Sequence, residues 1–169
     1  MRNKRVVITG LGMVTALGND VPTNWQNLLQ GKSGAGEITH FDCTKFKTQF
    51  ACEVKDLELT GLFDPKEQRR YDRYIHLAFK SAEEAIQDAQ IDMNLEDKLR
   101  CGVIYGSGMG GIKTLDVNIG GFGAGDGTPR YSPFFIPMII TNMAAGMLAI
   151  RHGFKGVNFS TTSACSSSA

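Results

Sequence analysis

The sequence predicts an α/β fold built on a mixed, largely parallel sheet with flanking helices. Three β-branched, apolar segments have the length of buried strands, over residues 5–11, 101–105 and 157–162, and helical segments separate them. Hydrophobic residues make up 42% of the 169 residues and charged residues 21%, as in ordinary soluble domains. The net charge of +1 and the short apolar runs give no reason to expect a nucleic-acid or membrane partner.

The first half of the chain contains one helix with clear start and stop signals. Residues 22–29 follow Asp20 and Val21, either of which can form the helix boundary, and they begin with a proline. A proline is tolerated in a first helical turn, because the N–H that it lacks has no partner there. Gly31 ends this helix, and a short strand is expected over residues 49–54.

The second half contains two expected helices and a glycine-rich segment. The clearest helix follows Pro65, with apolar residues spaced by three and four over residues 71–89. Another helix is expected over residues 137–151, stopped by Gly153. We interpret residues 106–130 as a flexible connection, whose length favours a functional role over a simple link.

The N-terminal segment and the cysteines indicate a cytoplasmic protein. The apolar stretch after the basic N-terminus is short and interrupted by Gly10 and Gly12, unlike a signal peptide. No two cysteines form a CxxC pair, and no histidine lies at metal-ligand spacing from one. We therefore expect reduced thiols and no metal site. The cysteines are Cys43, Cys52, Cys101 and Cys165.

Cys165 is the residue with the strongest chemical signal. It follows an expected strand and lies among serines, threonines and alanines, whose small side chains let the backbone turn and let a substrate reach the sulfur. If a helix begins here, its dipole and free N–H groups favour the thiolate. This is the logic of a strand–turn–helix nucleophile elbow with sulfur in place of oxygen. A buried, inert cysteine is the alternative.

Residues 106–111 match the pattern G-x-G-x-x-G after an expected strand. Asp126 even lies where a ribose-binding acid could be found. A dinucleotide site also requires a helix that begins at the third glycine, so that its N-terminus meets the pyrophosphate. Further glycines follow here instead, and we do not expect a nucleotide site.

Five segments, in this order and at these separations, resemble the N-terminal part of the β-ketoacyl-acyl-carrier-protein synthases, especially the type II condensing enzymes of fatty-acid synthesis. The resemblance runs from about residue 4 to the end and implies a thiolase-like fold. It also implies that residues 1–169 are the N-terminal part of such an enzyme, an incomplete first half that ends just after the nucleophile, without the C-terminal half. The segments are RVVITGLGMV from Arg5, KEQRR from Lys66, YGSGMGG from Tyr105, SPFFIP from Ser132 and SAC from Ser163.

The resemblance implies a decarboxylative Claisen condensation with Cys165 as the acyl-accepting nucleophile. The acyl chain becomes a thioester on Cys165, and the carbanion formed by decarboxylation of malonyl carrier protein attacks it to give a 3-oxoacyl product. The Cys165 N–H would form half of an oxyanion hole. Met109 matches the apolar gate of the acyl pocket, and Phe135 matches the aromatic residue that faces the gate. The plainer alternative is that both residues belong to the core.

The resemblance also implies that the protein binds acyl carrier protein through Lys66, Arg69 and Arg70. Carrier proteins are acidic, and Lys66 and Arg70 would share one helical face, as would Arg69 and Arg73. A solvated helix face is the alternative. Substrates would arrive on the phosphopantetheine of the carrier, with no further cofactor, and the whole enzyme would be a homodimer.

Two further expectations and three alternative functions accompany this hypothesis. The family's catalytic histidines and lysine lie downstream of the nucleophile, and no residue here matches them, so we expect residues 1–169 to be inactive alone. We interpret His76 and His152 as surface residues. A polyketide ketosynthase and a thiolase share much of the chemistry. A non-catalytic fragment or interaction module is the alternative from another class.

Overall fold

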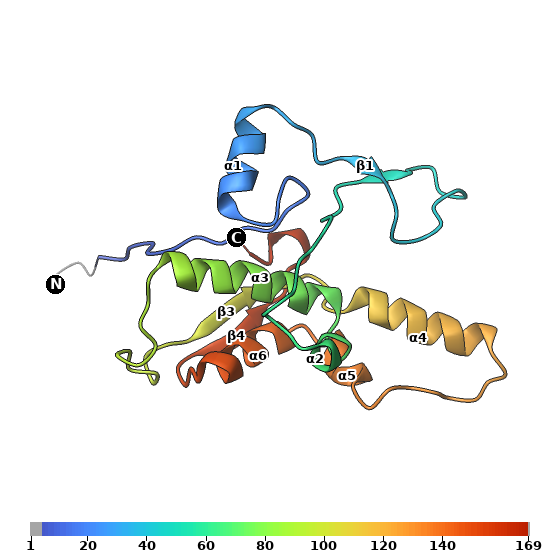
Figure 1. The fold of residues 1–169 in the computed structure, drawn as a ribbon. Helices are drawn as coiled ribbons and strands as arrows, with labels where there is room; N and C mark the ends of the chain where they lie inside the picture. The colour runs from blue at the N-terminus through green and yellow to red at the C-terminus, as the bar shows by residue number, and fades with distance from the viewer. Residues whose placement is uncertain (1–4, 169) are drawn as a thin grey trace. The chain divides into compact units, whose positions relative to one another are not determined.

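The computed structural model describes residues 5–168 (Figure 1). The chain forms two compact units, and helix α3 (Arg73–Asp88) contributes its first part to one and its second part to the other. Among the described residues, no helix has the length and apolar character needed to cross a membrane. The first unit is Met1–Leu59 with Lys80–Ile91, and the second is Thr60–Phe79 with Asp92–Ala169.

The first unit contains the predicted helix and a small hairpin. Helix α1 (Val21–Leu29) begins after Asp20, whose carboxylate accepts a hydrogen bond from the Thr23 amide at 2.7 Å. The helix and its boundary at Asp20 are therefore confirmed. Strands β1 (Gly36–Glu37) and β2 (Phe50–Ala51) pair antiparallel, so the strand expected over residues 49–54 is present in a shorter form.

The prediction of a buried strand over residues 5–11 is wrong. This segment has no assigned strand, and most of its valine and isoleucine side chains are exposed. A strand needs a neighbour to pair its N–H and C=O groups. Within the described part of the chain, the backbone here bonds instead to acidic side chains of α3. Leu11 N donates to Asp88 at 2.9 Å, and Met13 N donates to Glu84 at 2.8 Å.

The single helix expected after Pro65 is interrupted. Helix α2 (Pro65–Gln68) ends after one turn, and four residues separate it from the start of α3. Two aspartates explain the break. Asp64 forms a capping box with Glu67 at the start of α2. Asp72 starts α3, because its carbonyl accepts from the His76 amide at 3.4 Å and short acidic side chains favour helix starts over helix interiors.

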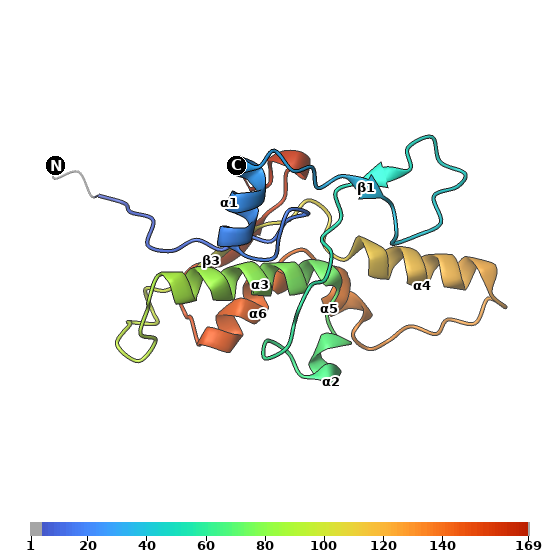
Figure 2. The ribbon, with the colours of Figure 1, turned by 45° about the horizontal axis from the view of Figure 1, so that its top comes forward.

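A helix occupies much of the segment that we interpreted as a flexible connection. Helix α4 (Ile112–Ala124) follows the glycine-rich loop, and the chain then returns to α5 (Phe135–Ile139), which packs against it (Figure 2). Glycines at positions 120, 121 and 123 disfavour a helix locally. Helix α4 contacts α5, and Asp72 binds its first turn; both partners lie outside the helix, so the local sequence does not reveal them.

The helix expected over residues 137–151 is also divided. After α5, the chain is extended at Ile140, and helix α6 (Met143–His152) begins three residues later. The Tyr74 hydroxyl donates to the carbonyl of Ile140 at 2.5 Å, so this carbonyl bonds outside the helix. Burial raises the pKa of Tyr74 to about 12. The predicted stop at Gly153 is confirmed, with φ +68°.

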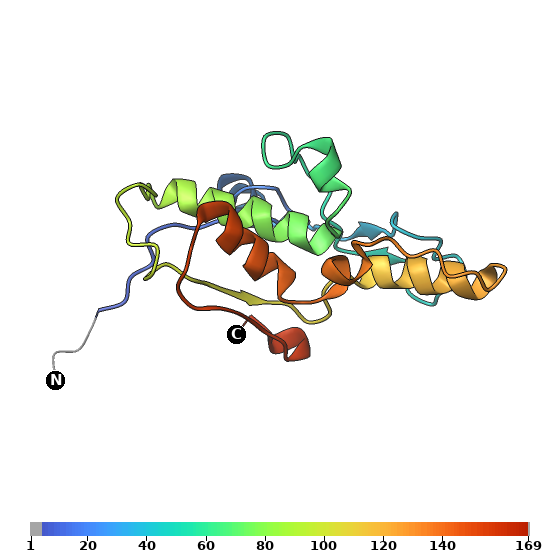
Figure 3. The same ribbon diagram turned by 90° about the horizontal axis from the view of Figure 1, so that it is seen from below.

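The second unit is built around a parallel pair of strands. Strands β3 (Val103–Gly106) and β4 (Asn158–Thr161) pair in register from Val103 opposite Asn158 to Gly106 opposite Thr161. Helices α4, α5 and α6 form the crossover between them, and α6 packs against both strands (Figure 3). Both expected strands and the α/β class are therefore confirmed. Buried apolar residues of this unit are Phe63, Ile75, Ala78, Phe79, Ala144, Ala145, Leu148 and Ala149.

Candidate active site

Cys165 lies on a sharp turn directly after β4. It is the middle residue of a short 3₁₀ helix, η1 (Ala164–Ser166), and its side chain is exposed. Ala164 has φ +51°, in the left-handed region, which costs a residue with a Cβ roughly 1–2 kcal/mol. The tight turn and the accessible sulfur are as the sequence predicts, and the alternative of a buried cysteine does not fit.

The turn that carries Cys165 is held by Ser167. This side chain is 7% exposed; its hydroxyl accepts from the Ser163 amide at 2.9 Å and donates to the Ala164 carbonyl at 2.6 Å. The Thr161 hydroxyl donates to the Ser167 carbonyl. Nothing in the sequence distinguished Ser167 from its neighbours. The run of serines itself was the available signal, since short hydroxyl side chains often bind nearby backbone groups.

The end of β3 and the glycine-rich loop after it pack directly against this turn. A Cβ added at Gly106 would lie 2.5 Å from the carbonyl oxygen of Ser167. Gly110 has φ +66°, and a Cβ there would lie 2.2 Å from the carbonyl oxygen of Ile139 in α5. Real Cβ atoms do not approach so closely, so both positions require glycine. The loop therefore lies between the Cys165 turn and α5.

The start of α4 bears on the dinucleotide interpretation. A helix does begin after Gly111, contrary to our expectation. Its first turn is already bound, however, because the buried Asp72 carboxylate accepts from the Thr114 amide at 3.0 Å and from the Thr114 hydroxyl at 2.5 Å. A carboxylate of the chain itself therefore holds a donor that a bound phosphate would use.

Asp72 also joins two helices, which gives a prediction about stability. Its other carboxylate oxygen accepts from the Tyr74 amide at 3.3 Å, so one side chain binds the first turns of α3 and α4. The change Asp72→Ala removes the acceptor for three buried or half-buried donors. We expect it to lower the free energy of unfolding by about 1–3 kcal/mol, measured by urea denaturation. Glu96→Ala, at an exposed carboxylate, is the control and should change it by less than about 0.5 kcal/mol. Equal effects would contradict the assigned role.

An open cavity of about 480 Å³ lies beside α5 in the second unit. Its lining includes three cations, Arg69, Arg73 and Lys113, and the buried residue Asp72. Phe135 adds an apolar surface. Cys165 does not line this cavity, so the cationic lining and the sulfur are separate features of the unit.

Similarity to known proteins decides the family of this chain. Residues 3–169 match the family described as "Beta-ketoacyl synthase, N-terminal domain". The chain belongs to the β-ketoacyl synthase family. The 3-oxoacyl-[acyl-carrier-protein] synthase 2 of Coxiella burnetii (strain RSA 493 / Nine Mile phase I) is 44% identical over 165 residues, which are 98% of this chain and 40% of that protein. The enzyme of the same name from Staphylococcus aureus (strain COL) is 43% identical over 164 residues, 97% of this chain and 39% of that protein. This chain spans about two fifths of the length of these curated relatives.

A solved structure gives the same result for the fold. It contains the acyl-carrier protein of a type II polyketide synthase in complex with its ketosynthase. The match has a TM-score of 0.71 at 21% identity and covers 95% of this chain and 42% of the other. The thiolase-like fold expected for this β-ketoacyl synthase segment is therefore confirmed.

The expected gate pair of the β-ketoacyl synthase lies on two segments that meet. Met109 is in the glycine-rich loop and is 69% exposed. Phe135 is the first residue of α5, is half-buried and stacks on Tyr131 with ring centroids 5.3 Å apart. Gly110 brings the loop against α5, yet Phe135 lines the cavity and Met109 does not. Their roles as gate and facing ring stay predictions.

The cations expected to dock a carrier protein lie at and just after α2. Helix α2 ends at Gln68, so Lys66 and Arg70 do not share a helical face as we expected. For the same reason Arg69 and Arg73 do not share one. Lys66 and Arg69 are exposed. The Arg70 guanidinium lies 4.8 Å from the centroid of the Phe134 ring. Stacking on this ring fixes Arg70 in a way that no helical pattern predicts.

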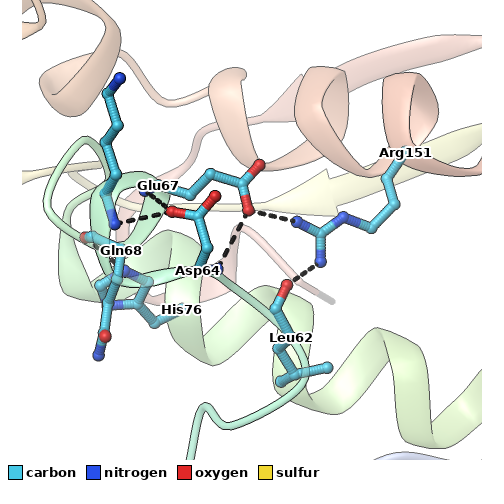
Figure 4. Close-up of polar contacts among 7 residues, drawn as sticks. Leu62, Asp64, Glu67, Gln68, His76 and Arg151 are labelled. Carbon is cyan, nitrogen blue, oxygen red and sulfur yellow. Dashed lines mark hydrogen bonds and ion pairs between the residues drawn. The ribbon is translucent and has the colours of Figure 1, made fainter.

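His76 is not the surface residue that we expected. Its ring is half-buried and lies 5.3 Å from the Phe63 ring, and its Nε2 is 3.1 Å from the Gln68 carbonyl (Figure 4). Burial lowers the pKa of His76 below its usual value, so the ring is neutral at neutral pH. The ring therefore packs the end of α2 against α3. His152 is also half-buried and stacks on Phe154.

Proposed function

We propose that this chain is the N-terminal part of a 3-oxoacyl-[acyl-carrier-protein] synthase of fatty-acid elongation. The observation that carries the proposal is the exposed Cys165 on a turn that Ser167 and the glycine-rich loop hold in place, in a chain of the β-ketoacyl synthase family. Fatty-acid elongation is favoured over polyketide synthesis, because the relatives at 43–44% identity are named 3-oxoacyl-[acyl-carrier-protein] synthase 2. The family match favours a ketosynthase over a thiolase.

In the proposed reaction, Cys165 acts twice through its sulfur. The thiolate first attacks the carbonyl carbon of an acyl-carrier thioester, and the carrier leaves as its free thiol after taking up a proton. Malonyl carrier protein then loses carbon dioxide, and the resulting carbanion attacks the new thioester carbon. The bond to Cys165 sulfur breaks, which restores the thiolate and releases a 3-oxoacyl-carrier product. The Cys165 N–H is proposed as one donor to the oxyanion in both attacks.

The proposed partner is an acidic acyl carrier protein bound by Lys66, Arg69 and Arg70. The exposure of Lys66 and Arg69 supports this proposal, since a docked partner can reach both side chains. Substrates would be presented on the phosphopantetheine of the carrier, with no separate cofactor. We further propose that the whole enzyme is a homodimer. We also propose a cytoplasmic location, and the four free cysteines support that location.

The full-length synthase tests this function directly. Purified enzyme is mixed with acyl carrier protein loaded with an acyl chain and with malonyl carrier protein, and both products are measured. We expect one carbon dioxide for each 3-oxoacyl-carrier product formed. Condensation of two coenzyme A thioesters without loss of carbon dioxide would instead indicate a thiolase. The absence of any condensation would support a non-catalytic module.

A further inference from the structure

We propose that Arg151 is a positioning residue for carrier-protein docking, because it fixes the segment of residues 62–67, which contains Lys66 and directly precedes Arg69 and Arg70. This inference rests on the docking role proposed above for Lys66, Arg69 and Arg70. Arg151 lies in the last turn of α6, far along the chain from that segment. It makes three contacts with the segment and a fourth with Phe79 of α3.

Two of the contacts are polar and hold the backbone and a side chain of the segment (Figure 4). The Arg151 Nη1 donates a hydrogen bond to the carbonyl of Leu62. Its Nη2 lies 3.8 Å from the Glu67 carboxylate, in an ion pair whose side chains are 27% and 39% exposed. One guanidinium therefore binds both ends of the segment at once. A planar group with several fixed donors can do this, whereas an ammonium group offers only a point charge.

The other two contacts are with aromatic rings. The guanidinium carbon of Arg151 lies 4.8 Å from the centroid of Phe63, a residue of the segment, and 4.5 Å from that of Phe79 in α3. Both rings are buried, at 8% and 0% exposure. A cation over the face of a buried ring is attracted more strongly than one at an exposed ring. Arg151 therefore joins the segment to the core of the second unit.

The ion pair with Glu67 extends to the docking residues through the cap of α2. The Glu67 carboxylate also accepts from the Asp64 amide at 3.3 Å. The Asp64 carboxylate accepts in turn from the amides of Lys66 at 2.7 Å and Glu67 at 2.8 Å. A helix of four residues is too short to be stable by itself, so α2 depends on these caps and on packing. Arg151 thus supports the backbone that presents Lys66.

Order in this segment matters for docking, because the proposed complex is weak. Exposed ion pairs each contribute little, and a mobile segment would have to be ordered every time the carrier binds. A segment that is already fixed avoids this loss of conformational freedom. Loss of Arg151 should therefore weaken binding of the carrier and leave the chemistry at Cys165 unchanged.

The test compares Arg151→Met with the wild type in the full-length synthase. Methionine retains a long apolar side chain and removes both polar contacts. We expect the KM for acyl carrier protein to rise about fivefold. The kcat, and the kcat/KM for a small acyl thioester such as an N-acetylcysteamine thioester, should stay unchanged. Equal losses with both substrates would overturn the inference, because they would indicate general damage to the enzyme.

Hydrogen exchange gives a second readout that does not depend on activity. The amides of α2 should exchange faster in Arg151→Met, while those of α6 keep their protection. Glu67→Gln removes the charge of Glu67 and keeps an acceptor for the Asp64 amide. It should raise the KM for acyl carrier protein by a smaller factor, and it replaces Arg151→Met as the test variant if Arg151→Met fails to fold. Lys155→Met, at an exposed cation just after α6, is the matched control and should change neither readout. Unchanged exchange of α2 in Arg151→Met would overturn the inference.

Charge reversal of the docking cations separates the two proposals. If Lys66→Glu, Arg69→Glu and Arg70→Glu together leave the KM for the carrier unchanged, the docking role is wrong and the role of Arg151 is wrong with it. If they raise this KM and Arg151→Met does not, docking stands and only the positioning role is overturned. In the combined variant, Arg151→Met should add little, since its effect acts through those cations.

Discussion

Cys165→Ala should lower the condensation rate of the full-length synthase by about 10³-fold or more while leaving its thermal midpoint unchanged. The rate falls because no other sulfur lies on the turn after β4, so an acyl chain has nowhere to be transferred. The fold should tolerate the change, because the turn is held by Ser167 and the side chain of Cys165 is exposed. Steady-state kinetics and thermal unfolding measure the two effects separately.

Cys52→Ala is the matched control for this experiment. Cys52 is also exposed, and it lies beside β2 in the other unit. We expect its replacement to leave condensation at the wild-type rate. Condensation at near the wild-type rate in Cys165→Ala would show that another group is the nucleophile, and the proposed mechanism would then be abandoned.

Reversing the charges of Lys66, Arg69 and Arg70 to glutamate should raise the KM for acyl carrier protein by about tenfold or more. Each exposed pair with an acidic partner is worth only about 0–1 kcal/mol, but reversal replaces three attractions with three repulsions. The difference from the wild type should shrink as salt brings the Debye length below about 8 Å. Activity with a small thioester should not change, since it needs no protein contact.

Two further variants sharpen this docking experiment. Reversal of Lys45 and Lys47, which are exposed cations of the first unit, changes the net charge without touching α2 and should leave the KM unaffected. Arg70→Gln tests a cation that is stacked on Phe134 and should have a smaller effect than reversal. An unchanged KM at low salt in the triple variant would mean that these residues form an ordinary solvated surface.

The parts of the fold that the sequence predicted are those with local signals. Asp20 marks the start of α1, Gly153 marks the end of α6, and the β-branched runs mark β3 and β4. Each of these signals depends on residues within one or two turns of the element. The tight turn and the exposed sulfur at Cys165 belong to the same class, because the small residues around it are its immediate neighbours.

The predictions that were wrong concern elements whose contacts are with residues far away in the chain. Asp72 starts α3 through its carbonyl and binds Thr114 in α4 through its carboxylate, so the same residue explains an unexpected helix break and helps to explain an unexpected helix. Tyr74 binds the carbonyl of Ile140 between α5 and α6. Arg151 reaches Leu62 across 89 positions of sequence. Such contacts leave no periodic pattern, and they appear only when the elements are placed together.

Mass spectrometry of the acylated enzyme tests the central claim most directly. The full-length synthase is incubated with acyl carrier protein in the absence of malonyl carrier protein, so that the first transfer occurs and the second step cannot. We expect the mass of one acyl group on the peptide that contains Cys165, released by hydroxylamine as a thioester is, and none on peptides that contain Cys43, Cys52 or Cys101. An acyl group on any other residue, or no acyl group on an enzyme that condenses when malonyl carrier protein is added, would contradict the assignment of Cys165.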